Sequence, residues 1–188
     1  MNFKQRFKNK YQTSNNAYGN QPVAGLEKTL KYVSGNETLE LGIGSGRNAI
    51  HLIEKKLKVT GVDSSKEGLD ILRKKVKSDN LTLINQDVLS YKFNKKFDLI
   101  LSVGLMHFLK PSDSKILFER IQKNTKPNGI NFVVVKMSQN IIGDLPNVFI
   151  TNQLKNIYLS QQWKILNYVE IQNRNKKIAR IIAKKATN

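Results

Sequence analysis

The sequence predicts an α/β protein with a mostly parallel sheet of seven strands, helices on both faces and an antiparallel hairpin at the C-terminal end. Three observations support this prediction. Short apolar runs alternate with apolar stripes at helical spacing along most of the chain. A glycine-rich loop follows the first of these runs. The last two runs are joined by a turn too short for a crossover, so they must pair antiparallel.

The predicted elements follow one another in this alternating order. Residues 1–20 are polar and basic, and a helical pattern follows over residues 23–33. Beyond it, strands and helices alternate, which is typical of βαβ units with right-handed crossovers and hence of a Rossmann-like sheet. The strands are expected at residues 38–41, 59–62, 81–84, 97–102, 130–136, 163–171 and 176–184, and the helices at residues 49–57, 69–76, 111–121 and 154–159.

The length of 188 residues suits one domain, which we divide into an N-terminal helical lid or cap, residues 1–35, and a cofactor-binding core, residues 36–188. Without cysteine the chain forms no disulfide, thiolate metal site or cysteine nucleophile, and we expect no metal site. Its start lacks the apolar segment of a secretory signal, and no run approaches the roughly 20 apolar residues of a membrane span. We therefore expect a cytoplasmic protein with no membrane partner, of undetermined oligomeric state.

The composition is strongly basic, with 32 Lys and Arg against 14 Asp and Glu and a net charge of +18. Such a charge favours nucleic acid or a small anionic substrate as a partner. Lys outnumbers Arg by 26 to 6, however, whereas phosphate recognition more often uses the bidentate guanidinium of Arg. Together with 21 Asn residues, this excess of Lys indicates a compositional bias of the whole chain. Both explanations of the charge stay open at this point.

The clearest functional motif is the loop after the first predicted strand, where Gly42, Gly44 and Gly46 alternate with other residues. Glycines at these positions let a ligand approach the backbone closely and allow positive φ angles. A dinucleotide-binding loop has the pattern G-x-G-x-x-G, but Arg47 stands where its third glycine belongs. Glu40, two residues before the first glycine, repels a pyrophosphate and suits a cationic group.

A second acid, Asp63, ends the second predicted strand 21 residues after Gly42. Ligands of such sheets bind beyond the carboxyl ends of the strands, and an acid at this position hydrogen-bonds ribose hydroxyls. The glycine loop, Glu40 and Asp63 together fit a nucleoside that carries an amino-acid tail and no phosphate. They therefore predict S-adenosyl-L-methionine as the cofactor.

Over nearly its whole length the chain resembles the class I S-adenosylmethionine-dependent methyltransferases, in residues 39–46, 61–65, 86–88, 97–102 and 126–130. The resemblance implies that the glycine loop holds the methionine part of the cofactor and that the acid after the second strand holds the ribose. The acid after the third strand then contacts the adenine amino group, and the loop after the fourth strand faces the transferring methyl group. The cofactor-binding residues so implied are Glu40, Gly42, Gly44, Gly46, Arg47, Asp63, Ser64, Asp87, Val88, Ser102 and Val103.

A closer resemblance is to the bacterial tellurite-resistance methyltransferases, in residues 44–48, 97–109 and 125–129. In that family a His-Arg pair in the last hairpin takes part in binding the oxyanion substrate. The hairpin of this chain, residues 171–176, is shorter and contains no His, which leaves Arg174 as the candidate to replace one partner. Because the sixth strand must run toward the ligand edge, its turn is expected to bring Arg174 near the substrate.

Four further side chains are candidates for contact with the substrate or the cofactor. His107, after the fourth strand, either acts as a base or orients the substrate, or else packs locally at a helix start. Arg47 either binds an anion or lies over the cofactor, or is solvated at a helix N-terminus, where a cation is disfavoured. Tyr11 and Tyr18 either belong to a lid that excludes water or simply pack on the core.

The sequence thus predicts an enzyme that uses S-adenosyl-L-methionine to methylate a small molecule by in-line transfer, an oxyanion such as tellurite or selenite or else a thiol. The alternative is an RNA methyltransferase that acts on a ribose or ring nitrogen and is drawn to its substrate by the basic surface. Methylation of exocyclic amines is disfavoured, because residues 102–105 read Ser-Val-Gly-Leu instead of Asp/Asn-Pro-Pro-aromatic. A non-catalytic cofactor-binding module and an NAD-dependent dehydrogenase are weaker alternatives.

Overall fold

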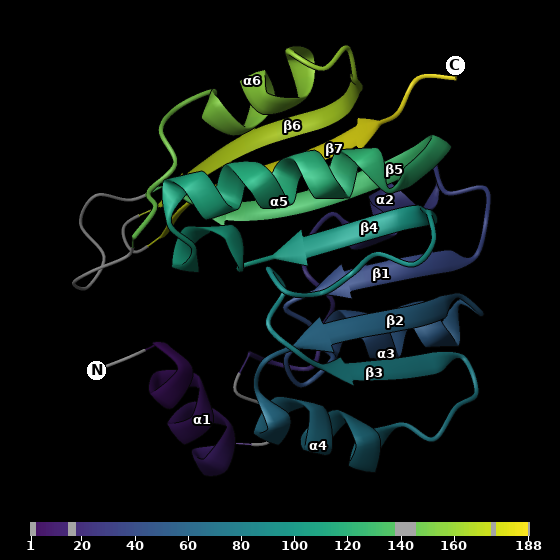
Figure 1. Cartoon of the computed structure of the whole chain (residues 1–188), viewed down its shortest axis with the longest axis vertical. Helices are drawn as coiled ribbons and strands as arrows, with labels where there is room; N and C mark the ends of the chain where they lie inside the picture. The colour runs from purple at the N-terminus through teal and green to yellow at the C-terminus, as the bar shows by residue number, and fades with distance from the viewer. Residues whose placement is uncertain (1–2, 15–17, 138–145, 174–175, 188) are drawn as a thin grey trace.

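The computed structural model of the chain describes residues 3–14, 18–137, 146–173 and 176–187. Helices flank one sheet of seven strands, as the sequence predicts (Figure 1). In chain order the elements are α1 (Phe3–Thr13), α2 (Leu26–Leu30), β1 (Glu37–Leu41), α3 (Arg47–Glu54), β2 (Lys58–Asp63), α4 (Lys66–Lys75), β3 (Leu81–Asn85), β4 (Phe97–Val103), the 3-10 helix η1 (Met106–Phe108), α5 (Pro111–Lys123), β5 (Thr125–Lys136), α6 (Gln153–Leu159), β6 (Lys164–Asn173) and β7 (Lys176–Lys184).

The sheet has the strand order β3-β2-β1-β4-β5-β7-β6. Neighbouring strands are parallel from β3 to β5, whereas β7 pairs antiparallel with both β5 and β6. This confirms the predicted parallel sheet with a C-terminal hairpin. The chain order reverses between β1 and β4, where Leu41 pairs with Val62 on one side and with Ser102 on the other. Ligands of open α/β sheets bind beyond the carboxyl ends of the strands at such a reversal.

Two apolar clusters cover the two faces of the sheet. On one face, Leu117 of α5 and Tyr158 of α6 are fully buried against Ile100 of β4. On the other face, α2, α3 and α4 bury Leu26, Leu52, Leu69 and Leu72 against β2, β4 and β5. Burial of a large apolar side chain contributes about 1.5–3 kcal/mol, so these clusters are the main source of stability.

No helix lies between β3 and β4 in the described chain, and the connection itself covers the sheet there. Val88 and Tyr91 of this connection are buried, and the Arg120 guanidinium of α5 donates hydrogen bonds to the carbonyls of Leu89, at 2.7 Å, and Tyr91.

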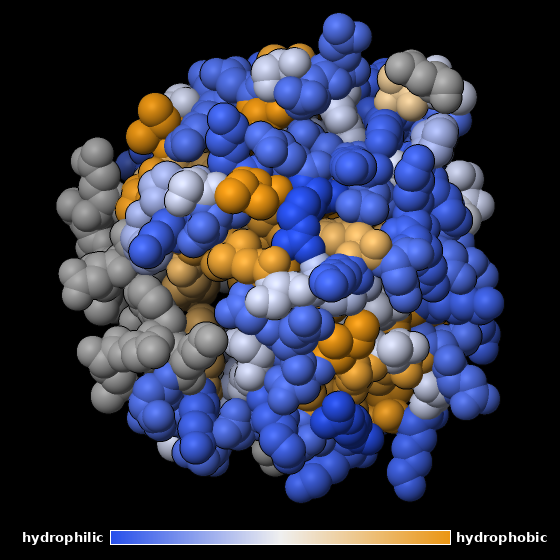
Figure 2. All heavy atoms as spheres, viewed as in Figure 1, coloured by the Kyte–Doolittle hydropathy of each residue, from blue (hydrophilic) through white to orange (hydrophobic). Residues whose placement is uncertain are grey.

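Figure 2 shows a largely hydrophilic face with apolar side chains in separate patches. No helix in the described part of the chain is long and apolar enough to cross a membrane.

Two predicted elements differ from the observed ones. The helical pattern over residues 23–33 yields only the five residues of α2, because Gly25 just before it has φ 96° and the chain turns again after Leu30. The fifth strand begins at Thr125 and not at residue 130. Residues 127–129, which read Pro-Asn-Gly, lie inside the strand as an irregularity, with Asn128 at φ 60° and a register shift opposite β4.

Candidate functional site

The glycine loop connects β1 to α3 at the carboxyl edge of the sheet, and its three glycines all need positive φ. Gly42, Gly44 and Gly46 have φ angles of 74°, 56° and 80°, which disfavour any residue with a side chain. The Gly42 amide donates to the carbonyl of Val62 at 2.8 Å, which ties the loop to the end of β2. A Cβ atom at Gly42 would lie 3.3 Å from Cβ of Leu105, so the loop after β4 packs against the glycine loop.

We expect Gly46→Ala to lower the free energy of unfolding by about 2 kcal/mol, because an alanine there combines a left-handed backbone with a collision against Leu72. Gly19→Ala is the matched control, since Gly19 has φ 79° and no atom within 4 Å of an added Cβ. It tests the backbone effect alone. Urea unfolding of the three proteins measures both changes. Equal losses in the two variants would show that contact with α4 contributes nothing.

Glu40 is the most deeply buried acid of the site. It is 2% exposed, and its Oε1 accepts a hydrogen bond of 2.7 Å from Nδ2 of Asn48. Its Oε2 is buried without a hydrogen-bond partner among the described residues. Burial raises the pKa of Glu40 to about 7, although Asn48 and Arg47 oppose the shift and Asp63 adds to it. A buried carboxylate oxygen without a partner is costly and suits a cationic ligand group.

Asp63 ends β2 directly beside the glycine loop. Its Oδ2 accepts a 2.8 Å hydrogen bond from the Gly44 amide, and its Oδ1 accepts one of 2.8 Å from the Ser65 amide. Burial raises the pKa of Asp63, and backbone N–H groups, including that of Ser64, oppose the shift. The side chain is thus held by backbone donors, and each oxygen keeps a further lone pair for ligand hydroxyls.

The remaining predicted cofactor residues lie at the carboxyl ends of β3 and β4, on either side of Glu40 and Asp63. Asp87 follows β3, the neighbour of β2, and accepts a 3.0 Å hydrogen bond from the Leu89 amide. Val88 is a buried core residue. At the end of β4, Ser102 is fully buried and its hydroxyl has no partner among the described residues, while Val103 is half-buried.

His107 lies in η1, just beyond β4, and is 1% exposed. Its Nδ1 accepts a 3.4 Å hydrogen bond from the backbone amide of Lys136, at the end of β5. Burial, together with the nearby Lys136 charge, lowers the pKa of His107 to about 3. The imidazole is therefore neutral near pH 7, and because Nδ1 is an acceptor, its proton resides on Nε2. This arrangement favours an orienting role over that of a base.

Tyr11 of α1 reaches into the glycine loop from the N-terminal segment. The side chain is 7% exposed, and its hydroxyl lies where a Cβ atom on Gly44 would be. Its ring also packs against Gly68, where an added Cβ would meet Cε2 at 3.1 Å. Burial raises the pKa of Tyr11 well above its usual range, and Asp63 contributes to the shift. The hydroxyl is therefore protonated and available as a donor.

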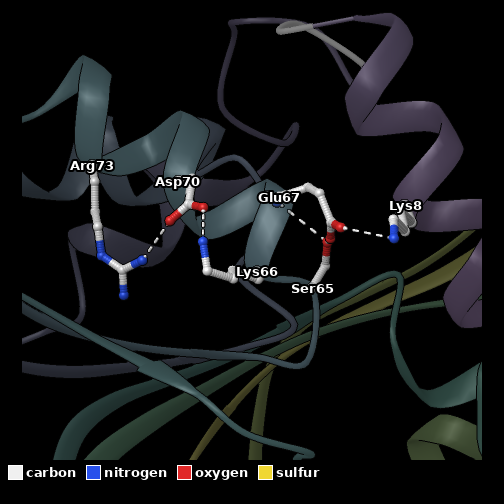
Figure 3. A network of polar contacts seen from close by, with 7 residues as sticks. Lys8, Ser65, Lys66, Glu67, Asp70 and Arg73 are labelled. Atoms are coloured by element: carbon white, nitrogen blue, oxygen red, sulfur yellow. Dashed lines mark hydrogen bonds and ion pairs between the residues drawn. The ribbon is translucent and has the colours of Figure 1, made fainter.

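Two further contacts hold the N-terminal segment over this edge. The Arg47 guanidinium donates a 3.0 Å hydrogen bond to the carbonyl of Tyr18, whose ring lies 6.0 Å from that of Tyr11. Figure 3 shows Lys8 of α1 directed at Glu67 of α4, with a nitrogen–oxygen distance of 3.9 Å. Arg47 thus contacts the N-terminal segment, which the sequence did not indicate.

The structure brings Glu40, the glycine loop, Asp63 and Tyr11 together, and it places His107 farther along the edge, on the side of β5. Arg174 lies outside the described residues. Sequence reasoning missed two residues, Asn48 and Lys136. Asn48 lies eight positions after Glu40, and a polar residue in the first helical turn after a glycine loop is a signal that would have found it.

A hollow of about 340 Å³ lies between α5 and α6. It is lined by the apolar side chains of Phe118, Phe149 and Ile157, together with polar groups such as Gln122 and Asn147. None of the strand-tip residues described above contributes to it. It is therefore separate from the candidate site.

Comparisons with known proteins bear on the family and the fold of the chain. The family model described as Tellurite resistance protein TehB matches residues 2–184. The probable S-adenosyl-L-methionine-dependent methyltransferase TehB of Haemophilus influenzae (strain 10810) is 28% identical over 145 residues, which are 74% of this chain and 50% of that protein. The chain spans about half the length of the curated relatives of this name that it matches.

Solved structures share the fold. The crystal structure of TehB from Haemophilus influenzae has a TM-score of 0.75 at 24% identity, covering 85% of this chain and 61% of that one. The N-methyltransferase NodS from Bradyrhizobium japonicum WM9, solved in complex with S-adenosyl-L-homocysteine, has a TM-score of 0.79 at 15% identity and covers 98% and 99% of the two chains. Both likenesses show the Rossmann-like methyltransferase fold.

Proposed function

The chain belongs to the TehB family of S-adenosyl-L-methionine-dependent methyltransferases, and we propose that it transfers the methyl group of this cofactor to a small anionic acceptor. The observation that carries the proposal is the set of groups along one sheet edge. The partnerless Oε2 of Glu40, the three glycines in positive φ and the Asp63 carboxylate lie together there. This combination suits a nucleoside with an amino-acid tail better than a pyrophosphate.

Each part of the proposed cofactor can be assigned to residues of this edge. The loop between Gly42 and Gly46 would cradle the methionine part, with Glu40 facing its ammonium group. Asp63 and Ser64 would take the ribose, and Asp87 with Val88 the adenine. When bound, S-adenosyl-L-methionine supplies a methyl group on a sulfonium with a neutral leaving group, so an anionic nucleophile needs no general acid or base. Most of the acceleration then comes from positioning.

On the acceptor side, we assign orientation to the loop after β4. Ser102 and Val103 would face the methyl group, and His107 would present Nε2–H to the acceptor, because its Nδ1 is occupied by the Lys136 amide. Arg174 remains a proposed anion-binding residue at the hairpin turn. The neighbouring strand ends support this placement, since Lys136 at the carboxyl end of β5 pairs with Ile178 near the start of β7.

We further propose that residues 1–35 form the lid and residues 36–188 the cofactor-binding core of one domain. Support comes from Tyr11, which is buried against Gly44, and from the hydrogen bond between Arg47 and Tyr18. Both contacts connect the N-terminal segment to the glycine loop. Such a lid would exclude water from the methyl group.

Tyr11→Ala is expected to speed the dissociation of S-adenosyl-L-homocysteine roughly tenfold, because the aromatic ring that closes over the glycine loop is lost. Stopped-flow displacement measures the rate. Tyr32→Ala serves as the control, since Tyr32 is 38% exposed and outside the site. An unchanged dissociation rate in Tyr11→Ala would contradict the lid.

The function itself is tested with the purified chain, S-adenosyl-L-methionine and separate acceptors. Mass spectrometry detects methylated oxyanions formed from tellurite and selenite, headspace analysis detects the volatile products of thiols and halides, and a labelled-methyl assay on bulk RNA runs in parallel. The proposal predicts cofactor-dependent product from at least one small anion. If only RNA acquires label, the small-molecule proposal is wrong.

The net charge of +18 supports RNA as the second candidate acceptor. A protein that neutralises many phosphates loses affinity steeply as salt rises. Binding of labelled RNA at increasing salt therefore separates the two proposals. A steep slope with retained binding at physiological salt would favour RNA, and weak binding would favour compositional bias as the origin of the charge.

A further inference from the structure

The strand order divides the ligand edge into two sides. Glu40 lies near the end of β1, Asp63 ends β2 and Asp87 follows β3, and these three strands lie on one side of the reversal. β4 and β5 lie on the other side, and their carboxyl ends carry His107 and Lys136. A group that recognises the acceptor, and not the cofactor, is expected on this second side.

Three backbone interactions hold Lys136 in place. Its amide donates to Nδ1 of His107 at 3.4 Å, its carbonyl accepts a 3.3 Å hydrogen bond from the Phe149 amide, and it pairs with Ile178 across the sheet. The side chain is half-buried, and its Nζ lies 5.9 Å from the ring centre of Phe108. The ammonium group therefore stands beside η1 at a defined position.

The Phe108 ring beside this ammonium group is itself packed between two other rings. Phe108 contacts Phe7 of α1 edge to face, with ring centres 4.9 Å apart, and lies 4.3 Å from the imidazole of His107. Rings exclude water, which strengthens the attraction between a cation and an anion. The helix that carries Tyr11 thus also closes over the surroundings of Lys136.

Gly104 faces the imidazole without a close contact. A Cβ atom at Gly104 would meet only Cε1 of His107 within 4 Å, at 3.9 Å, among the described residues. Gly104 has φ 72° and follows β4 directly. The edge of the imidazole that carries Cε1 therefore faces Gly104, and Nε2–H is the ring donor that no hydrogen bond to Lys136 occupies.

We propose that Lys136 Nζ and His107 Nε2–H form the subsite that binds the charge of a small oxyanion acceptor. This inference rests on the proposed function and adds its specificity-determining residue, Lys136. The ammonium group supplies the countercharge, and the neutral imidazole donates one directed hydrogen bond. A thiol or a neutral amine gains little from this pair, so the subsite selects oxyanions.

The test uses the full chain saturated with S-adenosyl-L-homocysteine and inorganic selenite as the probe. The chain has only two histidines, His51 and His107, so ¹⁵N-histidine NMR reports on the subsite directly and His51 serves as an internal reference. Selenite should shift the His107 signals in a saturable way and leave those of His51 in place. Lys136→Gln should weaken this binding at least tenfold, and Lys136→Arg should retain most of it.

The matched control is Lys58→Gln, which makes the same charge change at the exposed amino end of β2, on the opposite edge of the sheet. It should leave selenite binding unchanged. Equal weakening in Lys136→Gln and Lys58→Gln, or no shift of His107 in the native chain, would overturn the inference. Calorimetry of S-adenosyl-L-homocysteine on the same samples separates the two proposals: if this ligand does not bind, the proposed function fails, and if it binds while Lys136→Gln has no effect, the subsite alone fails.

Discussion

Asp63→Asn is expected to weaken S-adenosyl-L-homocysteine binding roughly 100-fold, or about 3 kcal/mol. The native carboxylate accepts hydrogen bonds of 2.8 Å from the amides of Gly44 and Ser65. An asparagine side chain has only one acceptor oxygen, so its NH₂ group must face one of these donors. The change therefore disturbs the glycine loop and also removes the charge that would hold the ribose hydroxyls.

Isothermal titration calorimetry measures this affinity, and urea unfolding checks that the variant is folded. Asp79→Asn is the matched control, since Asp79 is an exposed acid in the turn before β3. It should bind as the native chain does. A native affinity in Asp63→Asn would mean that the ribose lies elsewhere.

Glu40→Gln is expected to have the second large effect, on both the pH dependence of stability and cofactor binding. Burial raises the pKa of Glu40 to about 7 in the folded chain, from 4.5 for an ordinary glutamate. A carboxyl group with a raised pKa stabilises the fold fully below its unfolded pKa. This contribution is lost as the pH rises through the folded pKa.

Because of this group, the free energy of unfolding of the native chain should fall by about 3 kcal/mol between pH 4.5 and pH 8. Glutamine mimics the protonated acid, so Glu40→Gln should remove most of this fall. Urea unfolding at several pH values measures both slopes. Glu119→Gln, an exposed position on α5, is the control. Identical slopes in native chain and Glu40→Gln would show that Glu40 is ionised throughout.

The same substitution tests the proposed ammonium contact. A cationic ligand group beside Glu40 favours its charged form, so S-adenosyl-L-homocysteine should bind more tightly as the pH rises through about 7 and should release a proton. Calorimetry in buffers of different ionisation enthalpy detects this proton. Glu40→Gln should bind roughly tenfold to 100-fold more weakly, with no proton release. Proton release that persists in the variant would place the ammonium group elsewhere.

The sheet could be predicted almost completely from the sequence, because its signals are local. Every predicted strand is present, since each one is a short apolar run bounded by polar residues or glycine. The glycine loop and Asp63 could also be predicted, because their positions along the chain follow from the strand ends. Helix α1 was missed as a separate element: its polar residues give little periodicity, and its packing against α4 is a tertiary contact.

The chain's own pattern of residues thus determined the strands and their mostly parallel direction, the edge where a ligand is expected to bind and the chemical type of its first contacts. Only the tertiary structure decided the protonation state of those groups and the residues that they contact. Burial at the junction of β1, β2 and the N-terminal segment raises the pKa of Glu40, and burial against β5 lowers that of His107. Both shifts depend on burial and on charges distant in sequence, such as Asp63 for Glu40 and Lys136 for His107, and no local pattern reports them.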